Sequence, residues 1–228
     1  MERKRFRPVV LALLVLMAST AMAYIPPASF LMDRLAYKRN KTGVRRLKVK
    51  MQCQGVEHNL YLKVSGLVRR ERGKDAVEIC KSGKCWLKSG DQKPRKLPKW
   101  TYLPYLYFVE GEVKGSRWLA LLESLKVDTK VDAITRFHSR VAVVLGAKTW
   151  ERDRPQFWLD KDRFVPLRLM LLDGKSLMDI QWIEWGTKTG GDWFPSVMEI
   201  RKDGKVIERC EVDEVTSGVS MPEDLFKL

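Results

Sequence analysis

The amino-acid sequence predicts a mainly β protein in which about ten or eleven antiparallel strands form a meander that curls into a barrel or half-barrel, with a few helices. Apolar and polar residues alternate along most segments from Val44 onward, as in strands with one buried and one solvated face. Residue pairs favoured in tight hairpin turns separate several segments, at 173–174, 190–191 and 203–204. Because a meander of many twisted strands tends to curl, we expect a single large β domain over residues 24–228.

The first 23 residues have the pattern of a removable export signal. Basic residues near the start precede an uncharged apolar run from Val9 to Ala18, and small residues then lead to Ala23. The run is about half of the roughly 20 apolar residues that a membrane-spanning helix needs. We therefore expect residues 1–23 to be a signal peptide, removed by cleavage between Ala23 and Tyr24. The first mature position is not a cysteine, so we expect a soluble protein without a lipid anchor.

The chain is strongly basic. Its formal net charge is +15, and residues 1–23 hold four basic residues and one acidic residue, which leaves +12 on the remainder. A field of this sign favours anionic partners such as lipid headgroups, nucleic acid or acidic proteins, and it does not choose between them. Export argues against nucleic acid. A basic surface that only keeps the protein soluble is the simpler alternative.

Four cysteines lie in the part of the chain that follows the signal. An even number of cysteines in an oxidising compartment predicts two disulfides. Cys80 and Cys85 enclose a four-residue turn with a glycine, which would place them opposite one another on paired strands. Elimination leaves Cys53 to pair with Cys210. A metal site is the weaker interpretation, because the chain has two histidines and no second closely spaced cysteine pair.

Two helical segments are expected. After the proline pair at 26–27, residues 28–40 place Phe30, Leu31 and Leu35, with Ala36, on one side at helical spacing. A second helical segment, at about 100–126, interrupts the strands. It begins with a run rich in aromatic residues, and its later part places four apolar side chains along one helical stripe: Trp118, Leu119, Leu122 and Leu125.

Strands are expected in two groups on either side of this insertion. The first group covers 44–53, 60–64, 76–80 and 85–88. The second begins near 131 and continues through 141–145, 156–159, 165–172, 177–185, 194–201 and 205–215. Some strands, most clearly 165–172, are apolar on both faces, which exceeds what a sheet covered on one side needs. This surplus of apolar residues predicts a cover over the second face.

Short motifs follow one another in the second half of the chain in a characteristic order. They are Phe157-Trp158-Leu159-Asp160, Val165-Pro166-Leu167-Arg168, Asp173-Gly174-Lys175, Trp193-Phe194-Pro195 and the closing Met221-Pro222 with Leu225-Phe226. In order and spacing these motifs resemble the carboxyl half of the LolA-like family of outer-membrane lipoprotein-sorting proteins (LolA/LolB-like fold). With the opening helix and the basic strand after it, the resemblance spans most of residues 28–228. Three cysteines, Cys53, Cys80 and Cys85, have no counterpart in the family's pattern.

The resemblance implies a half-open antiparallel β-barrel wrapped over an apolar cavity, with helices as a lid. It also implies a periplasmic carrier that holds the acyl chains of a lipoprotein or a related lipid between an inner-membrane donor and an outer-membrane acceptor. The lid residues expected to face the cavity are Leu103, Phe108, Trp118, Leu119 and Leu122. The expected floor of the cavity consists of Leu47, Val49, Met51, Leu60, Leu62 and Val64. The alternative is that the helices fill the whole interior.

Catalytic motifs do not stand out in this sequence. There is no nucleophile elbow, phosphate-binding loop or zinc signature, and no histidine lies beside a plausible nucleophile. We therefore expect a monomeric binding protein without a cofactor, and not an enzyme. The alternative from another class of function is an envelope sensor or structural binding module that recognises a protein or an anionic lipid surface through its basic face.

Overall fold

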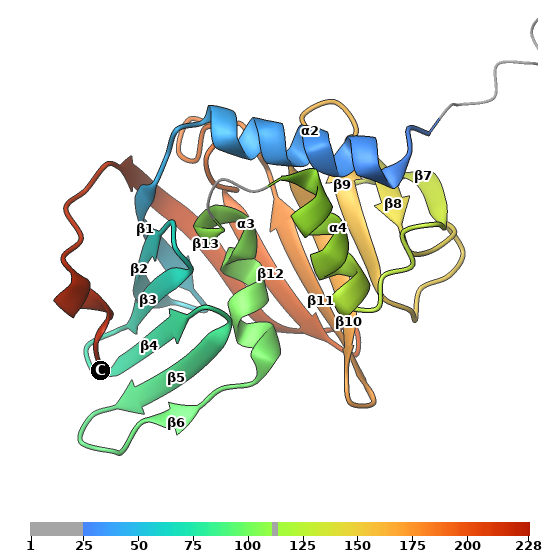
Figure 1. The fold of residues 1–228 in the computed structure, drawn as a ribbon. Coiled ribbons are helices and arrows are strands. Elements are labelled where there is room, and N and C mark those ends of the chain that lie inside the picture. Colours follow the sequence, from blue (N-terminus) through green and yellow to red (C-terminus); the bar gives the residue numbers. More distant parts are fainter. Residues whose placement is uncertain (1–24, 111–113) are drawn as a thin grey trace, which may run out of the picture.

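The computed structural model describes residues 25–110 and 114–228; the expected signal, with its cleavage site between Ala23 and Tyr24, lies outside this part of the chain. Within it, thirteen strands form one antiparallel, curved sheet with helices on its concave side (Figure 1). The strands are β1 (Arg46–Cys53), β2 (Val56–Lys63), β3 (Leu67–Arg72), β4 (Ala76–Lys81), β5 (Lys84–Ser89), β6 (Arg95–Lys96), β7 (Asp132–Phe137), β8 (Arg140–Leu145), β9 (Gln156–Asp160), β10 (Pro166–Asp173), β11 (Ser176–Ile183), β12 (Val197–Lys202) and β13 (Lys205–Ser217). The helices are α2 (Ala28–Lys41), η1 (Lys99–Tyr105), α3 (Leu106–Val109), α4 (Gly115–Ser124) and η2 (Glu223–Phe226).

The sheet consists of two meanders joined at their chain ends. Its strand order is β6-β5-β4-β3-β2-β1-β13-β12-β11-β10-β9-β8-β7, so that the first strand pairs with the last. The expectation of one meander in sequence order is therefore wrong. Strands β6 and β7 form opposite edges of the sheet, which leaves the barrel half-open. Because η1, α3 and α4 connect these two edges, the chain between β6 and β7 has to cross the concave face.

The sheet has two strands that the sequence pattern did not indicate. Strand β3 was missed because Arg70 occupies one of its inward positions next to Val68, and this hides the alternation of apolar and polar residues. Strand β6 has two residues and pairs with β5 through Trp86 and Leu87. A strand of this length is too short to show any periodicity.

Helix α2 packs one side against the sheet and turns the other to solvent. Leu31, Met32, Leu35 and Ala36 are buried in the main core. Phe30, which the sequence pattern placed on the same side, is 44% exposed. The buried side of the helix is centred on Leu31 and Met32, and Phe30 lies outside this side.

In the part of the chain that the structure describes, residues 25–110 and 114–228, every helix is too short or too polar to span a membrane.

Helix α4 starts in very close contact with α2. A Cβ atom at Gly115 would lie 2.5 Å from the backbone nitrogen of Asp33, which is closer than real Cβ contacts. Any residue larger than glycine would therefore push the start of α4 away from α2. The two helices together cover the concave face of the sheet beside η1 and α3 (Figure 1).

Two disulfides join strands at positions that are directly paired in the sheet. Cys53 of β1 bonds to Cys210 of β13, and Cys80 of β4 bonds to Cys85 of β5, which are the pairings expected from the sequence. The first bridge spans 157 residues of chain and the second spans 5. The Cys53–Cys210 bridge therefore holds the two meanders together, whereas the other closes a local hairpin.

We predict that the two bridges contribute unequally to stability. By the chain-entropy model, the double change Cys53→Ala and Cys210→Ala lowers the free energy of unfolding by about 5 kcal/mol. The matched change Cys80→Ala and Cys85→Ala costs about 2 kcal/mol, because its loop is much shorter. Denaturant unfolding of both variants and the wild type measures these losses. Equal losses in the free energy of unfolding for the two variants would contradict the larger role of the Cys53–Cys210 bridge.

Candidate functional site

A small apolar cavity lies under the helices, against strands β9, β10 and β11. Its volume is about 20 Å³, close to the space of a single water molecule. The sheet contributes Phe157, Pro166, Leu169 and Trp182, and the covering helices contribute Leu35, Leu103, Leu106, Tyr107, Trp118, Leu121 and Leu122, with Leu125 just after α4. The protein's own side chains thus fill almost all of the space between these helices and the sheet.

An open groove adjoins this cavity. Its volume is about 450 Å³, and it runs from the turn between β4 and β5 to the end of β10. Four leucines line both the groove and the cavity: Leu103, Leu106, Leu121 and Leu125. Leu172, at the outer end of the groove, is 51% exposed. The groove and the cavity are therefore neighbouring parts of one apolar path, separated by side chains of η1, α3 and α4.

The expected lid residues divide into two groups. Leu103, Trp118 and Leu122 are buried and line the cavity. Phe108 is buried elsewhere, where its ring centroid lies 4.5 Å from that of Phe194. Leu119 is partly buried against the core and does not line the cavity. Leu121 and Leu125 also line the cavity but were not among the expected lid residues, although Leu125 lies on the predicted helical stripe.

The expected floor residues lie in another part of the concave face. Five of them are buried in the main core on β1 and β2: Leu47, Val49, Met51, Leu60 and Leu62. Val64 lies just beyond β2 and is partly exposed. None of the six lines the cavity, because α3 packs over β2 while the cavity lies against β9, β10 and β11. Phe157, Leu169 and Trp182 form the strand side of the cavity instead.

Hydrogen bonds attach η1, α3 and α2 to their surroundings. The indole nitrogen of Trp182 donates to the carbonyl of Pro104 at 3.0 Å. The buried guanidinium of Arg39 donates to the carbonyls of Tyr107 at 3.0 Å and Phe108 at 2.7 Å. The Tyr105 hydroxyl accepts from Arg70 at 3.2 Å. In the described residues, no side-chain hydrogen bond of this kind joins α4 to the sheet, and α4 contributes apolar side chains to the cavity.

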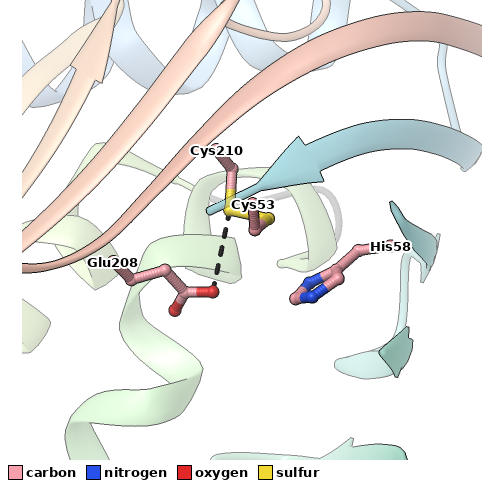
Figure 2. A group of neighbouring side chains, drawn as sticks. All are labelled: Cys53, His58, Glu208 and Cys210. Atoms are coloured by element: carbon pink, nitrogen blue, oxygen red, sulfur yellow. Dashed lines mark hydrogen bonds between the residues drawn. A yellow bond between two sulfur atoms is a disulfide. The ribbon is translucent and has the colours of Figure 1, made fainter. Parts of the chain in front are cut away.

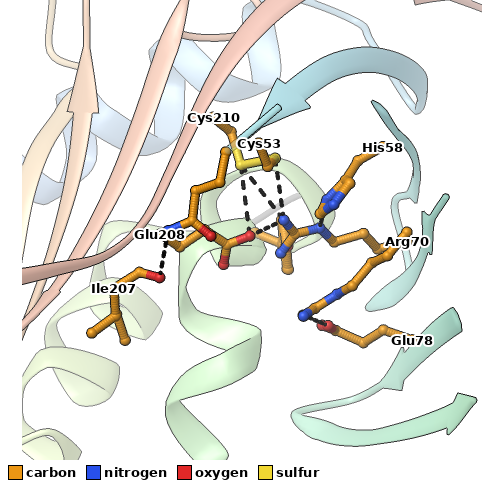
Figure 3. The surroundings of a disulfide bond; sticks show 10 residues. Cys53, His58, Arg70, Glu78, Ile207, Glu208 and Cys210 are labelled. Atoms are coloured by element: carbon orange, nitrogen blue, oxygen red, sulfur yellow. Dashed lines mark hydrogen bonds and ion pairs between the residues drawn. A yellow bond between two sulfur atoms is a disulfide. The ribbon is translucent and has the colours of Figure 1, made fainter. Parts of the chain in front are cut away.

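A buried charged cluster surrounds the Cys53–Cys210 disulfide. Figure 2 shows the imidazole of His58 and the carboxylate of Glu208 on either side of the disulfide. The guanidinium of Arg70, 3% exposed, lies among them (Figure 3). It donates to Nδ1 of His58 at 2.9 Å and to Glu208, and it lies 3.3 Å from Sγ of Cys53 and 3.5 Å from Sγ of Cys210.

The charges in this cluster determine which groups are ionised. Burial and the positive charge of Arg70 lower the pKa of His58 to about 4. The imidazole is therefore neutral at physiological pH, and its Nδ1 can accept the hydrogen bond from Arg70. Burial opposes ionisation of Glu208, but the charge and hydrogen bond of Arg70 outweigh it and lower the pKa of that carboxyl. Arg70 and Glu208 thus form a charged pair inside the sheet.

The same cluster has ligand types that bind metals in other proteins. Cys53, His58, Glu208 and Cys210 present donor atoms within 4.8 Å of one another. Their sulfur atoms are joined to each other, whereas a metal ligand would be a free thiolate. Arg70 already places a positive charge in contact with all four side chains. The cluster is therefore a structural link between β1, β2, β3, β13 and η1, and does not fit a cation site.

The fold and the cavity define a class of protein: a half-open β-barrel whose apolar interior is covered by helices. The fold is similar to that of the LolA superfamily protein NE2245 from Nitrosomonas europaea, with 9% identity and a TM-score of 0.48, over 90% of this chain and 99% of that one. It is also similar to a DUF1329 family protein from Desulfovibrio piger, with 13% identity and a TM-score of 0.49, over 89% and 98%.

A weaker structural similarity is to a chain of the MucA/MucB complex of Pseudomonas aeruginosa. It has 19% identity and a TM-score of 0.31, and it covers 88% of this chain and 60% of that one. No protein-family model matches the sequence. No curated protein matches it either.

The charged cluster predicts a pH dependence of stability. Between pH 6.5 and about 4 the unfolded chain protonates His58 and the folded chain does not. The free energy of unfolding should therefore fall as the pH drops through this range, by about 2 kcal/mol after allowance for partial solvent screening. The variant His58→Gln keeps a hydrogen-bond acceptor for Arg70 but has no group that titrates at this position. Its free energy of unfolding should therefore lack the fall caused by His58 in this pH range. Parallel denaturation profiles of the two proteins between these pH values would contradict the prediction.

Proposed function

We propose that this chain is an exported periplasmic carrier that binds the acyl chains of a lipoprotein or a related lipid in outer-membrane lipoprotein sorting. The observation that supports this most directly is the open apolar groove that adjoins the closed cavity through four shared leucines. A volume of about 450 Å³ lies within the range of small-molecule sites, and the leucines of the lining suit a hydrocarbon chain, although charged side chains such as Lys99, Lys126 and Asp173 also line the groove.

Binding a whole acyl chain requires α4 to move away from the sheet. The cavity of about 20 Å³ is too small for more than a water molecule, so the groove has to extend inward at the expense of contacts made by α4. Displacing α4 exposes the apolar side chains of Trp118, Leu121 and Leu122 to water. An acyl chain replaces those contacts, and each methylene that leaves water contributes about 0.8 kcal/mol. The empty form is therefore closed and the loaded form open.

Two residues of the cavity lining have a buried donor that an acyl group can satisfy, and a plain hydrocarbon cannot, once α4 has moved. The indole nitrogen of Trp118 and the hydroxyl of Tyr107 are buried and have no hydrogen-bond partner in the part of the chain that the structure describes. A buried donor without an acceptor costs about 1 to 3 kcal/mol. The carbonyl oxygen of an ester or amide is an acceptor that an acyl chain brings with it. Its arrival would remove part of that cost.

A substitution that introduces one negative charge between the groove and the cavity tests the proposal. Leu121 lines both the groove and the cavity and is partly exposed, so Leu121→Glu leaves its carboxylate solvated in the empty protein. In the loaded protein the carboxylate would face hydrocarbon at a cost of several kcal/mol. The affinity for a fluorescent fatty-acid probe should fall at least about 100-fold. The matched control is Leu119→Glu on the same helix, which should stay within about threefold of the wild type.

Circular dichroism and denaturant unfolding establish that both variants are folded before their affinities are compared. The proposal is contradicted if the wild type shows no saturable binding of the probe. It is equally contradicted if folded Leu121→Glu binds as tightly as Leu119→Glu.

A further inference from the structure

The outward side of α2 carries a regular row of aromatic and basic residues. Phe30, Arg34, Tyr37 and Lys41 follow one another at spacings of four, three and four residues, which places them along one face of the helix. Phe30 is 44% exposed and Tyr37 is 58% exposed. Exposing large aromatic side chains to water to this extent is unfavourable in free energy unless a partner covers them.

Cation–π contacts hold this row together and join it to the neighbouring turn. The guanidinium of Arg34 lies 5.5 Å from the ring centroid of Phe30 and 5.6 Å from that of Phe164. The amine of Lys41 lies 5.9 Å from the ring centroid of Tyr37. The aromatic rings are therefore held at the surface beside positive charges instead of folding inward.

A wide open groove runs beside the row. Its volume is about 650 Å³, and it lies between α2, the turn after β9 and the loop before β12. Trp193 lines it and is 40% exposed. Among the groove residues, Lys38 and Arg163 lie near the Asp192 carboxylate, at 2.9 and 3.6 Å. Arg34 and Lys41 form no ion pair with any acidic residue of 25–110 or 114–228.

We propose that this face, defined as the α2 row with Trp193, docks on the surface of an anionic lipid bilayer. Aromatic rings favour the headgroup region, where one end of the ring is apolar and the other wet. Basic side chains beside them gain from the negative potential of anionic headgroups, by about 1 kcal/mol for each Lys or Arg near the surface. The net charge of +12 that remains without residues 1–23 adds a long-range attraction of the same sign.

The composition of the face favours a membrane over a protein partner. Aromatic residues and arginine are common in protein–protein interfaces, but lysine is depleted there and the centres of such interfaces hold few charges. Here positive charges alternate with aromatic rings along the whole row, so the face has no uncharged centre. The reverse side of α2 belongs to the core, and α2 contacts α4 at Gly115. Docking would therefore bring α4, the wall that moves in the proposed acyl binding, close to the bilayer, although the docking itself does not depend on the cavity having a cargo.

The test measures binding of the exported protein, processed at Tyr24, to sealed vesicles by co-sedimentation. Vesicles that contain phosphatidylglycerol are compared with vesicles of phosphatidylcholine only. The wild type should bind the anionic vesicles at least about tenfold more tightly, and added salt should weaken this binding. The double change Arg34→Glu and Lys41→Glu should lower the affinity for anionic vesicles at least about tenfold.

The matched control changes the charge of the protein by the same amount at another place. Lys175→Glu and Lys205→Glu alter two exposed hairpin turns, at the end of the sheet away from α2 (Figure 1). This variant should bind anionic vesicles within about threefold of the wild type. A third variant, Phe30→Ser with Tyr37→Ser, should weaken binding and keep its dependence on salt, because it removes the aromatic contacts and not the charges.

Three outcomes would overturn the proposal. One is a wild type that binds neither kind of vesicle or binds both equally. Another is an equal loss in the two charge-reversed variants, which would indicate attraction by net charge without a docking face. The third is binding to an acidic polypeptide such as polyglutamate but not to anionic vesicles. Leu121→Glu should bind anionic vesicles like the wild type, so a failure of the acyl carrier and a failure of the docking face give different results.

Discussion

The pairing of the first strand with the last is the interaction on which the rest of the structure depends. Because β1 pairs with β13, two separate meanders become one sheet, and the strands on either side of the central insertion become its opposite edges. The chain that connects those edges has to pass over the concave face, and it does so as η1, α3 and α4. The Cys53–Cys210 bridge and the Arg70–Glu208 pair lie at this junction, so the same few groups stabilise the sheet and, through Tyr105, attach the lid.

The closed interior and the proposed carrier role are compatible because the helices differ in how they are attached. Hydrogen bonds from Arg39, Arg70 and Trp182 hold η1 and α3 in place, whereas α4 faces the sheet through apolar side chains. Apolar contacts are not directional, so an acyl chain can replace them. A helix that fills the interior when the protein is empty also avoids exposing a large apolar surface to water. Under the proposed function, the filled core and the lipid cavity are two states of one site.

Much of the fold could be predicted from local patterns, and what could not depends on tertiary contacts. Alternation, turn residues and cysteine spacing indicated eleven of the thirteen strands and both disulfides. Strand β3 was hidden because Arg70 points inward, where only partners from β2, β13 and η1 make a charge acceptable. The pairing of β1 with β13 has no local signal. The sequence placed the floor of the expected lipid cavity on β1 and β2, whereas the small cavity of the structure lies against β9, β10 and β11.

Identification of the native cargo is the decisive experiment for the proposed carrier. The protein would be purified from the cells that produce it naturally, without detergent, and its organic extract analysed by lipid mass spectrometry. We expect acyl lipids or lipoprotein-derived acyl chains in a stoichiometric amount, and a marked loss of them in the Leu121→Glu variant purified in the same way. A wild-type protein that is free of acyl chains but co-purifies with a stable protein partner would contradict the carrier and favour a binding module.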